Sequence, residues 1–221
     1  MDEATSLDGY LFDRHARPRS ERPVEEPPRG RDVKLTAEDG APLAGTVWDA
    51  RGPSRGAVVV ASATGVRRRY YAPFAAWLAG RGFSVLTFDY RGIGGSRTKQ
   101  ARARASMADW GERVLPAAIQ GAVRELGEGE VRVVGRSVGG QLVGLLPDPS
   151  PIRAVVTVGS QSGDFRLWPA PSRYKMAVLW YGVVPSVTKA VGFLPGVLGV
   201  GEDLPAGVAL QWARWCRRPG Y

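Results

Sequence analysis

Histidine and cysteine are almost absent from this sequence. Among its 221 residues there is one of each, His15 and Cys216. A single cysteine excludes an intrachain disulfide, so cysteine usage gives no sign of an oxidising compartment. The Cys and His spacings of zinc sites are absent as well. We therefore expect neither a metal nor an organic cofactor.

Lysine is also scarce, because only four of the 30 basic residues are lysines and the rest are arginines. The formal net charge of +9 would suit an anionic partner such as nucleic acid. However, the arginines are scattered, and their densest run is 67–69. No signature of a nucleic-acid-binding fold accompanies them. We expect a solvated arginine-rich surface and no nucleic-acid partner; a module that binds an anionic surface is the weakest alternative.

Long apolar runs are missing too. The first residues, Met1 to Ala4, are acidic and no apolar stretch of the secretory type follows them. The apolar stretch 176–200 is interrupted by Pro185, Lys189 and Pro195, which argues against a bilayer span. The sequence therefore favours a cytoplasmic protein without stable membrane insertion, in which this stretch forms a lid over a substrate; transient lipid contact is the alternative.

Composition divides the chain into three parts. Residues 1–31 mix Glu, Arg and Pro with almost no apolar periodicity, which predicts a disordered or extended tail. Residues 32–159 contain the regular hydrophobic patterns of a single core domain. Residues 160–221 are rich in Trp, Pro and Gly, and we interpret them as a cap.

Between residues 32 and 159, strand and helix patterns alternate. The expected helices are 70–80, 106–126 with Ser106 as its N-cap and Pro116 as a kink, and 138–146. The expected strands are 33–36, 43–48, 56–61, 83–88, 131–134 and 152–158. This alternation predicts an α/β fold, a three-layer α/β/α sandwich around a mostly parallel sheet of about six strands.

One motif carries chemistry. Gly135-Arg136-Ser137-Val138-Gly139 fits G-x-S-x-G, and it directly follows a predicted strand and precedes a short apolar helix, as a nucleophile elbow requires. The two glycines are needed because a Cβ at either position would collide with the neighbouring strand or helix. This pattern predicts that Ser137 is a catalytic nucleophile.

Residues 88–96, Phe-Asp-Tyr-Arg-Gly-Ile-Gly-Gly-Ser, close an earlier buried strand. With the elbow, they resemble the α/β-hydrolase superfamily, in particular its serine aminopeptidase-like and lipase-like branch and a group of predicted bacterial members. The resemblance spans about residues 32–221. It implies that Asp89, Arg91 and Gly92 belong to a structural loop beside the active site, so that Asp89 is not the catalytic acid.

The resemblance extends to residues 61–66, Ala-Ser-Ala-Thr-Gly-Val, where the family has its oxyanion loop. It implies that the backbone N–H groups of Thr64 and Val138 bind the oxyanion. The sequence departs from the family at Ser62 and Ala63, where His and Gly are usual, and at Arg136, where His is common. A guanidinium next to the nucleophile would favour anionic substrates or simply point into a loop, and we favour the second interpretation.

The rest of a catalytic triad is missing. In this family the acid and then the histidine follow the serine, yet no histidine follows Ser137. His15 has the wrong place in the chain order. Asp164 is a weak candidate for the acid, and Asp148, Glu202 and Asp203 are further ones. The resemblance implies that the chain ends before the strands that carry the acid and the base.

The sequence thus predicts a serine hydrolase acting on a small-molecule ester, thioester or small amide through an acyl-enzyme, inactive or impaired because the histidine and the acid are missing. A non-catalytic binding protein of the same fold, or a gene fragment, is the alternative. A sheet that ends at its sixth strand exposes an unpaired edge, so poor solubility and self-association through that edge are expected.

Overall fold

The structure is a computed structural model that describes residues 26, 28–199 and 201–221. Its main sheet has six strands in the order β1-β2-β4-β3-β5-β6. The strands β3 to β6 run parallel to one another, whereas β1 pairs with β2 and β2 with β4 in antiparallel fashion. The predicted fold class is confirmed. The strands are β1 (Arg31–Thr36), β2 (Pro42–Trp48), β3 (Ala57–Ala61), β4 (Ser84–Phe88), β5 (Val131–Arg136) and β6 (Ile152–Val158).

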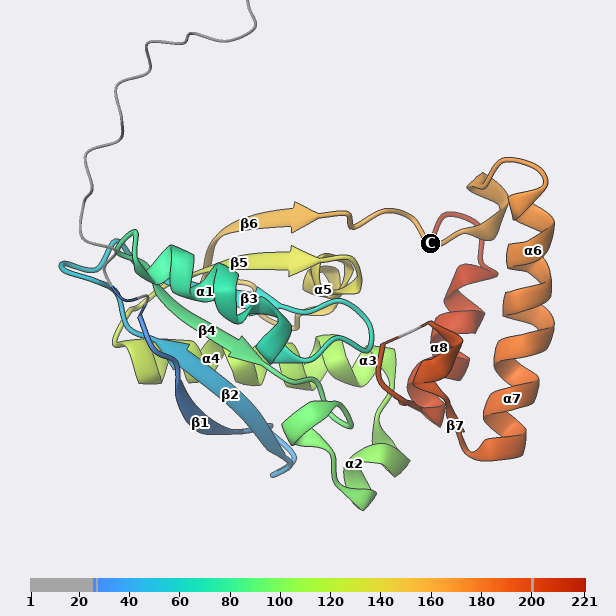
Figure 1. Cartoon of the computed structure of the whole chain (residues 1–221), viewed down its shortest axis with the longest axis horizontal. Helices are drawn as coiled ribbons and strands as arrows, with labels where there is room; N and C mark the ends of the chain where they lie inside the picture. Colours follow the sequence, from blue (N-terminus) through green and yellow to red (C-terminus); the bar gives the residue numbers. More distant parts are fainter. Residues whose placement is uncertain (1–25, 27, 200) are drawn as a thin grey trace, which may run out of the picture.

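Helices cover both faces of the sheet (Figure 1). Every residue of β3 is buried, because alternate side chains pack against the two different helix layers. Val59 belongs to the core that includes helix α4 (Leu115–Leu126). Val58 and Val60 belong to a second core, with helix α1 (Ala72–Ala79). The unbroken β-branched run is thus the pattern of a strand sandwiched between helices.

The helix predicted over 106–126 is present as α3 (Met107–Asp109), a wider π-helical turn (Trp110–Val114) and α4. The Ser106 hydroxyl caps it by accepting the Asp109 N–H at 3.0 Å. The Asp109 carboxylate forms an ion pair with Arg91 (3.1 Å). Pro116 lies just after the π turn, which accommodates a residue that has no N–H to donate.

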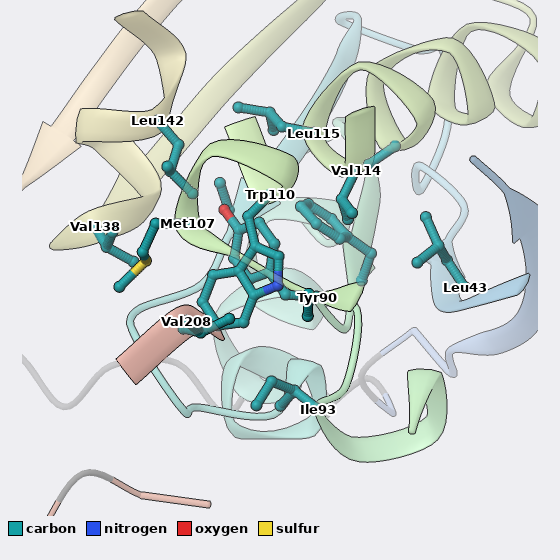
Figure 2. Close-up of a cluster of buried hydrophobic side chains, with 14 of the residues drawn as sticks. Leu43, Tyr90, Ile93, Met107, Trp110, Val114, Leu115, Val138, Leu142 and Val208 are labelled. Atoms are coloured by element: carbon teal, nitrogen blue, oxygen red, sulfur yellow. The ribbon is translucent and has the colours of Figure 1, made fainter. Parts of the chain in front are cut away.

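The largest buried side chains gather between this helix and the sheet edge at which the parallel strands end (Figure 2). Tyr90 and Trp110 stack with their ring centroids 4.6 Å apart, and the Trp110 indole donates a hydrogen bond to the Arg91 carbonyl (3.0 Å). Burying aromatic side chains of this size contributes about 2–3 kcal/mol each. This cluster supports the loop ends on which the candidate site is built.

Residues beyond β6 form a largely helical layer at one end of the sheet (Figure 1). Trp180 and Trp212 join two of its helical segments, with ring centroids 4.9 Å apart. Its elements are α6 (Ser172–Val178), a π turn (Leu179–Val183), α7 (Val184–Val191), the short paired strands β7 (Phe193–Leu194) and β8 (Leu204–Pro205), and α8 (Ala206–Cys216). Two further short helices, α2 (Lys99–Arg104) and α5 (Val138–Gln141), belong to the part of the chain before β6.

Strand β6 forms one edge of the described sheet, and β1 forms the other. Its residues after Ile152 are all exposed, with Val156 at 55% and Val158 at 49%. An apolar edge strand of this kind is a template for pairing with another chain. Self-association through β6 therefore stays a prediction.

The predicted tail, 1–31, lies mostly outside the described residues, and so does His15. Strand β1 begins at Arg31, one residue earlier than the predicted start of the core. Among the described residues, no helix is both long and apolar enough to span a bilayer.

Candidate active site

Ser137 occupies the one-residue turn between β5 and α5. Its backbone has φ 53° and ψ −121°, and it is the only non-glycine residue with positive φ in the described part of the chain. Such a conformation costs on the order of 1–3 kcal/mol and is maintained only when the surrounding structure enforces it. Here its N–H donates to the Val158 carbonyl (2.9 Å), and the Ser160 hydroxyl donates to its carbonyl (2.8 Å).

The two flanking glycines leave room for this turn. A Cβ on Gly139 would lie 2.2 Å from the Ala61 carbonyl oxygen, and one on Gly135 would lie 2.4 Å from the Gly140 Cα. Both contacts are with backbone, which cannot rotate away as a side chain can. The chain therefore needs glycine at both positions for helix α5 to approach β3 and β5 so closely.

The half-buried Ser137 lies where two cavities meet. One, of about 1010 Å³, is open and is lined by arginines as well as apolar residues. The other is small, about 120 Å³, and is lined by aromatic and apolar side chains such as Trp168 and Trp180. Ser137, Thr64 and Trp212 line both. A substrate whose reacting bond lies at Ser137 can thus extend in two chemically different directions.

Val138 follows Ser137 in the chain, and Thr64 lines both cavities together with Ser137. In the described part of the chain, neither the Thr64 N–H nor the Val138 N–H donates a hydrogen bond to a loop or turn carbonyl. Val138 is the first residue of α5, and the N–H of a first helical residue has no partner within its own helix. The Val138 side chain is buried beside Met107 (Figure 2), which fixes the orientation of its peptide. Two N–H groups without a protein acceptor among the described residues thus belong to residues that line the small cavity with Ser137.

The loop that carries Thr64 is held from two sides. The Tyr71 hydroxyl accepts the Ala63 N–H at 3.0 Å, and the Glu202 N–H donates to the Gly65 carbonyl at 2.8 Å. Burial raises the pKa of the Tyr71 hydroxyl, so it remains a neutral phenol at physiological pH. The loop is thereby fixed by Tyr71, at the start of the helix that follows it, and by Glu202 from the segment beyond β6.

No general base is found next to Ser137 in the described part of the chain, where its hydroxyl has no protein hydrogen-bond partner. Burial raises the pKa of the Cys216 thiol to about 12 and raises that of the Tyr221 phenol as well. Both groups line the small cavity but stay protonated at neutral pH, and a protonated group cannot accept the serine proton. Glu202, in the open cavity, pairs with Arg67 and Arg97.

The candidates for a catalytic acid have structural partners. Asp164 accepts from the Arg166 backbone (3.0 Å) and side chain (2.8 Å) and from the Gly220 N–H (3.3 Å). The pKa of the Asp164 carboxyl is lowered, and the hydrogen bond from the Arg166 side chain is the largest cause. Asp148 binds Ser150, and Asp203 accepts the Gly196 N–H. Of these three aspartates, none lines a cavity at Ser137.

Hydrogen bonds and ion pairs join the loop after β4 to other segments of the chain. Asp89 is buried and accepts from the backbone N–H groups of Arg68 (2.7 Å) and Gly95 (2.9 Å). Arg91, also buried, pairs with Asp39 (2.7 Å) and Asp109. Gly92 has φ +83°, and a Cβ there would lie 2.5 Å from Pro205. None of the three predicted loop residues lines a cavity at Ser137.

Two features of the site were not predicted from the sequence. Ser160 closely follows strand β6, which is parallel to β5. Because parallel strands present their carboxyl ends at one edge of the sheet, the position of Ser160 in the chain could have indicated that it lies near Ser137. Trp212 lies on α8, far along the chain from the elbow. No local pattern identifies it, because only the packing of the cap brings it to Ser137.

Comparisons with known proteins identify the family of this fold. A family model described as "alpha/beta hydrolase fold" matches residues 63–191. Two uncharacterized proteins from Mycobacterium tuberculosis strains are 43% identical over 70 residues, which cover 31% of this chain and 25% of each relative. The match thus spans about a quarter of those relatives' length.

Solved structures show the same fold. A hypothetical protein from Pseudomonas aeruginosa is 17% identical with a TM-score of 0.58, covering 86% of this chain and 73% of that one. A thermostable carboxyl esterase from Bacillus coagulans is 14% identical with a TM-score of 0.52, covering 74% of this chain and 52% of the esterase. Identities this low extend the likeness to the fold alone.

Proposed function

Because the chain belongs to the alpha/beta hydrolase fold family, we propose that it is a serine hydrolase in which Ser137 attacks an ester, thioester or small amide. The single observation that carries this proposal is the backbone of Ser137. A non-glycine residue at positive φ between a strand and a helix is costly, and here it presents to two cavities a hydroxyl that has no hydrogen-bond partner among the described residues.

The proposed reaction follows from the groups around that hydroxyl. Ser137 Oγ bonds to the acyl carbon, its proton passes to a base, and the carbonyl electron pair moves onto oxygen. The Thr64 and Val138 N–H groups stabilise that oxyanion, each contributing about 3–4 kcal/mol. The bond to the leaving group then breaks and the leaving atom takes the proton. Water attacks the acyl-enzyme in the same way, releasing the acid and restoring the serine.

A base beside Ser137 is the component that the described residues do not supply. Since the neighbouring titratable groups are neutral acids or an arginine-paired carboxylate, we propose that the chain alone turns over slowly. Loss of a triad member lowers kcat by a factor on the order of 10⁴–10⁶. We expect ester hydrolysis at least about a thousandfold below that of a relative with a complete triad.

Chemical rescue tests this proposal. Hydrolysis of 4-nitrophenyl acetate is measured with and without added imidazole, for the unaltered chain and for Ser137→Ala. After the rate in buffer alone is subtracted, imidazole should accelerate hydrolysis about tenfold for the unaltered chain and not at all for Ser137→Ala. A tenfold gain is smaller than the ~10²–10⁴-fold that a positioned base contributes, because free imidazole is not held in place. Equal rates for the two proteins at every imidazole concentration would refute it.

The absence of a base beside Ser137 in the described residues favours a second candidate, a non-catalytic binding protein of the same fold. In that case the two cavities would still bind a ligand, and neither imidazole nor high pH would produce turnover dependent on Ser137. Fast hydrolysis by the unaltered chain without imidazole would contradict both the second candidate and the proposed impairment.

A further inference from the structure

The two cavities that meet at Ser137 differ in charge. The small one is lined by Trp168, Met176, Trp180 and other uncharged side chains. The open one is lined by three arginines, Arg67, Arg69 and Arg136, against one acid, Glu202. Charged groups are costly to place in an apolar pocket, so an ionised part of any ligand belongs in the open cavity.

The single acid of the open cavity is already neutralised. Glu202 pairs with Arg67 and with Arg97 (3.3 Å) and accepts the Gly94 N–H (2.9 Å). Its side chain is only 9% exposed, so these partners enclose it. Arg67 is thus occupied, and no acid in the lining remains for the other two arginines.

Arg136 and Arg69 are the two cations left over. Within the described residues, neither has an ion pair or a side-chain hydrogen bond, and both side chains are exposed to the open cavity. Arg136 directly precedes Ser137, and its guanidinium lies over Gly159 at the end of β6, where a Cβ would be 3.1 Å from it. Its position beside the nucleophile is set by β5 and by the absence of a side chain at residue 159.

We infer that the substrate carries a negative charge, a carboxylate or a phosphate on its leaving group, that binds Arg136 and Arg69 while a small apolar acyl group fills the closed pocket. Arginine suits this role because its planar guanidinium offers paired N–H donors to a carboxylate or phosphate. The inference rests on the proposed function, since it assigns the reacting bond to Ser137. It replaces the earlier interpretation of Arg136 as a side chain that merely points into a loop.

A binding experiment that needs no catalysis tests the inference. In the Ser137→Ala background, 4-acetoxybenzoate and its neutral methyl ester are titrated by ligand-observed NMR; the two probes share one acyl group and differ in one charge. We expect the anion to bind about tenfold more tightly, the size of one charged hydrogen bond, and its affinity to fall as salt increases. Equal affinities for the two probes would overturn the inference.

Matched variants locate the charge. Arg136→Gln and Arg69→Gln should each reduce the preference for the anion by several-fold and leave the affinity for the methyl ester unchanged. The control is Arg153→Gln, which removes an exposed arginine paired with Glu130 at the opposite end of β6. Because the control changes the net charge equally, an equal loss in all three variants would contradict a specific site.

Failure of the function and failure of this inference are distinguishable. If imidazole rescue shows a reactive Ser137 but the two probes bind equally, the hydrolase proposal stands and the charge preference is wrong. If the anion binds preferentially through Arg136 but Ser137 never reacts, the cavity is an anion site in a protein without hydrolase activity.

Discussion

Two serines at the same edge of the sheet illustrate how different roles arise from similar sequences. Ser96 and Ser137 both lie in glycine-rich segments that follow buried parallel strands, β4 and β5. Ser96 is 1% exposed, and its hydroxyl donates to the Asp89 carbonyl (2.8 Å) and accepts the Ala44 N–H (2.9 Å). The Ser137 hydroxyl has no such partner among the described residues. A hydroxyl is available for chemistry only where the fold leaves its hydrogen bonds unused.

The largest expected effect concerns the elbow itself. Gly139→Val should lower the free energy of unfolding by more than about 4 kcal/mol or prevent folding, because its Cβ would overlap the Ala61 and Ser62 carbonyl oxygens. Gly144→Val, where a Cβ meets nothing within 4 Å, is the control. Urea unfolding followed by circular dichroism measures both. Similar stabilities for the two variants would mean that the turn is not as tight as described.

The next effect distinguishes the structural serine. Ser96→Ala leaves the partly buried Ala44 N–H without its acceptor, which should cost about 1–3 kcal/mol of stability. Reactivity of Ser137 in the folded fraction should be unchanged. Unfolding at constant temperature gives the first quantity, and labelling of Ser137 below the unfolding transition gives the second. A variant of unchanged stability would show that the Ser96 hydrogen bonds contribute nothing.

The strain at the catalytic candidate predicts a change of the opposite sign. Ser137→Gly should raise the free energy of unfolding by about 1 kcal/mol, because glycine adopts positive φ without steric cost, while abolishing reactivity. Ser137→Ala keeps the unfavourable backbone and should leave stability nearly unchanged. If the glycine variant were less stable than the alanine variant, the turn would not be strained.

The smallest effect at neutral pH concerns the buried thiol of Cys216. Burial raises the pKa of its thiol to about 12, so a disulfide reagent at pH 8 should react far more slowly with the folded chain than with the urea-unfolded chain. The neutral thiol contributes its stability fully below its ordinary pKa of about 9, and this contribution is lost as the pH rises from there towards 12. Equal reaction rates for folded and unfolded chains would contradict the burial.

The sequence predicted the elbow because its constraints are local. Gly135 and Gly139 report steric limits within one turn, and the strand and the helix on either side have clear patterns. The proposed oxyanion role of Thr64 and Val138 came from resemblance to a family rather than from any property of those residues, since a backbone N–H leaves no trace in the identity of its side chain.

The valine content of a strand does not by itself indicate how much of it is buried. β3, with Ala57 to Ala61, and β6, with Ile152 to Val158, are both rich in valine, yet every residue of the first is buried and most of the second is exposed. Burial depends on what lies beside a strand, which its own residues do not encode. The strands beyond β6 could not be predicted either. β7 and β8 have two residues each, which is too short for a periodic hydrophobic pattern.

The most direct test of the claim that Ser137 is a presented nucleophile is the mapping of a fluorophosphonate adduct on the full 221-residue chain. After prolonged incubation with imidazole, mass spectrometry of the digested protein should find one adduct on the peptide that contains Ser137, and none on that peptide's counterpart in Ser137→Ala. Labelling that is equal in both proteins, or that falls on another residue, would contradict it.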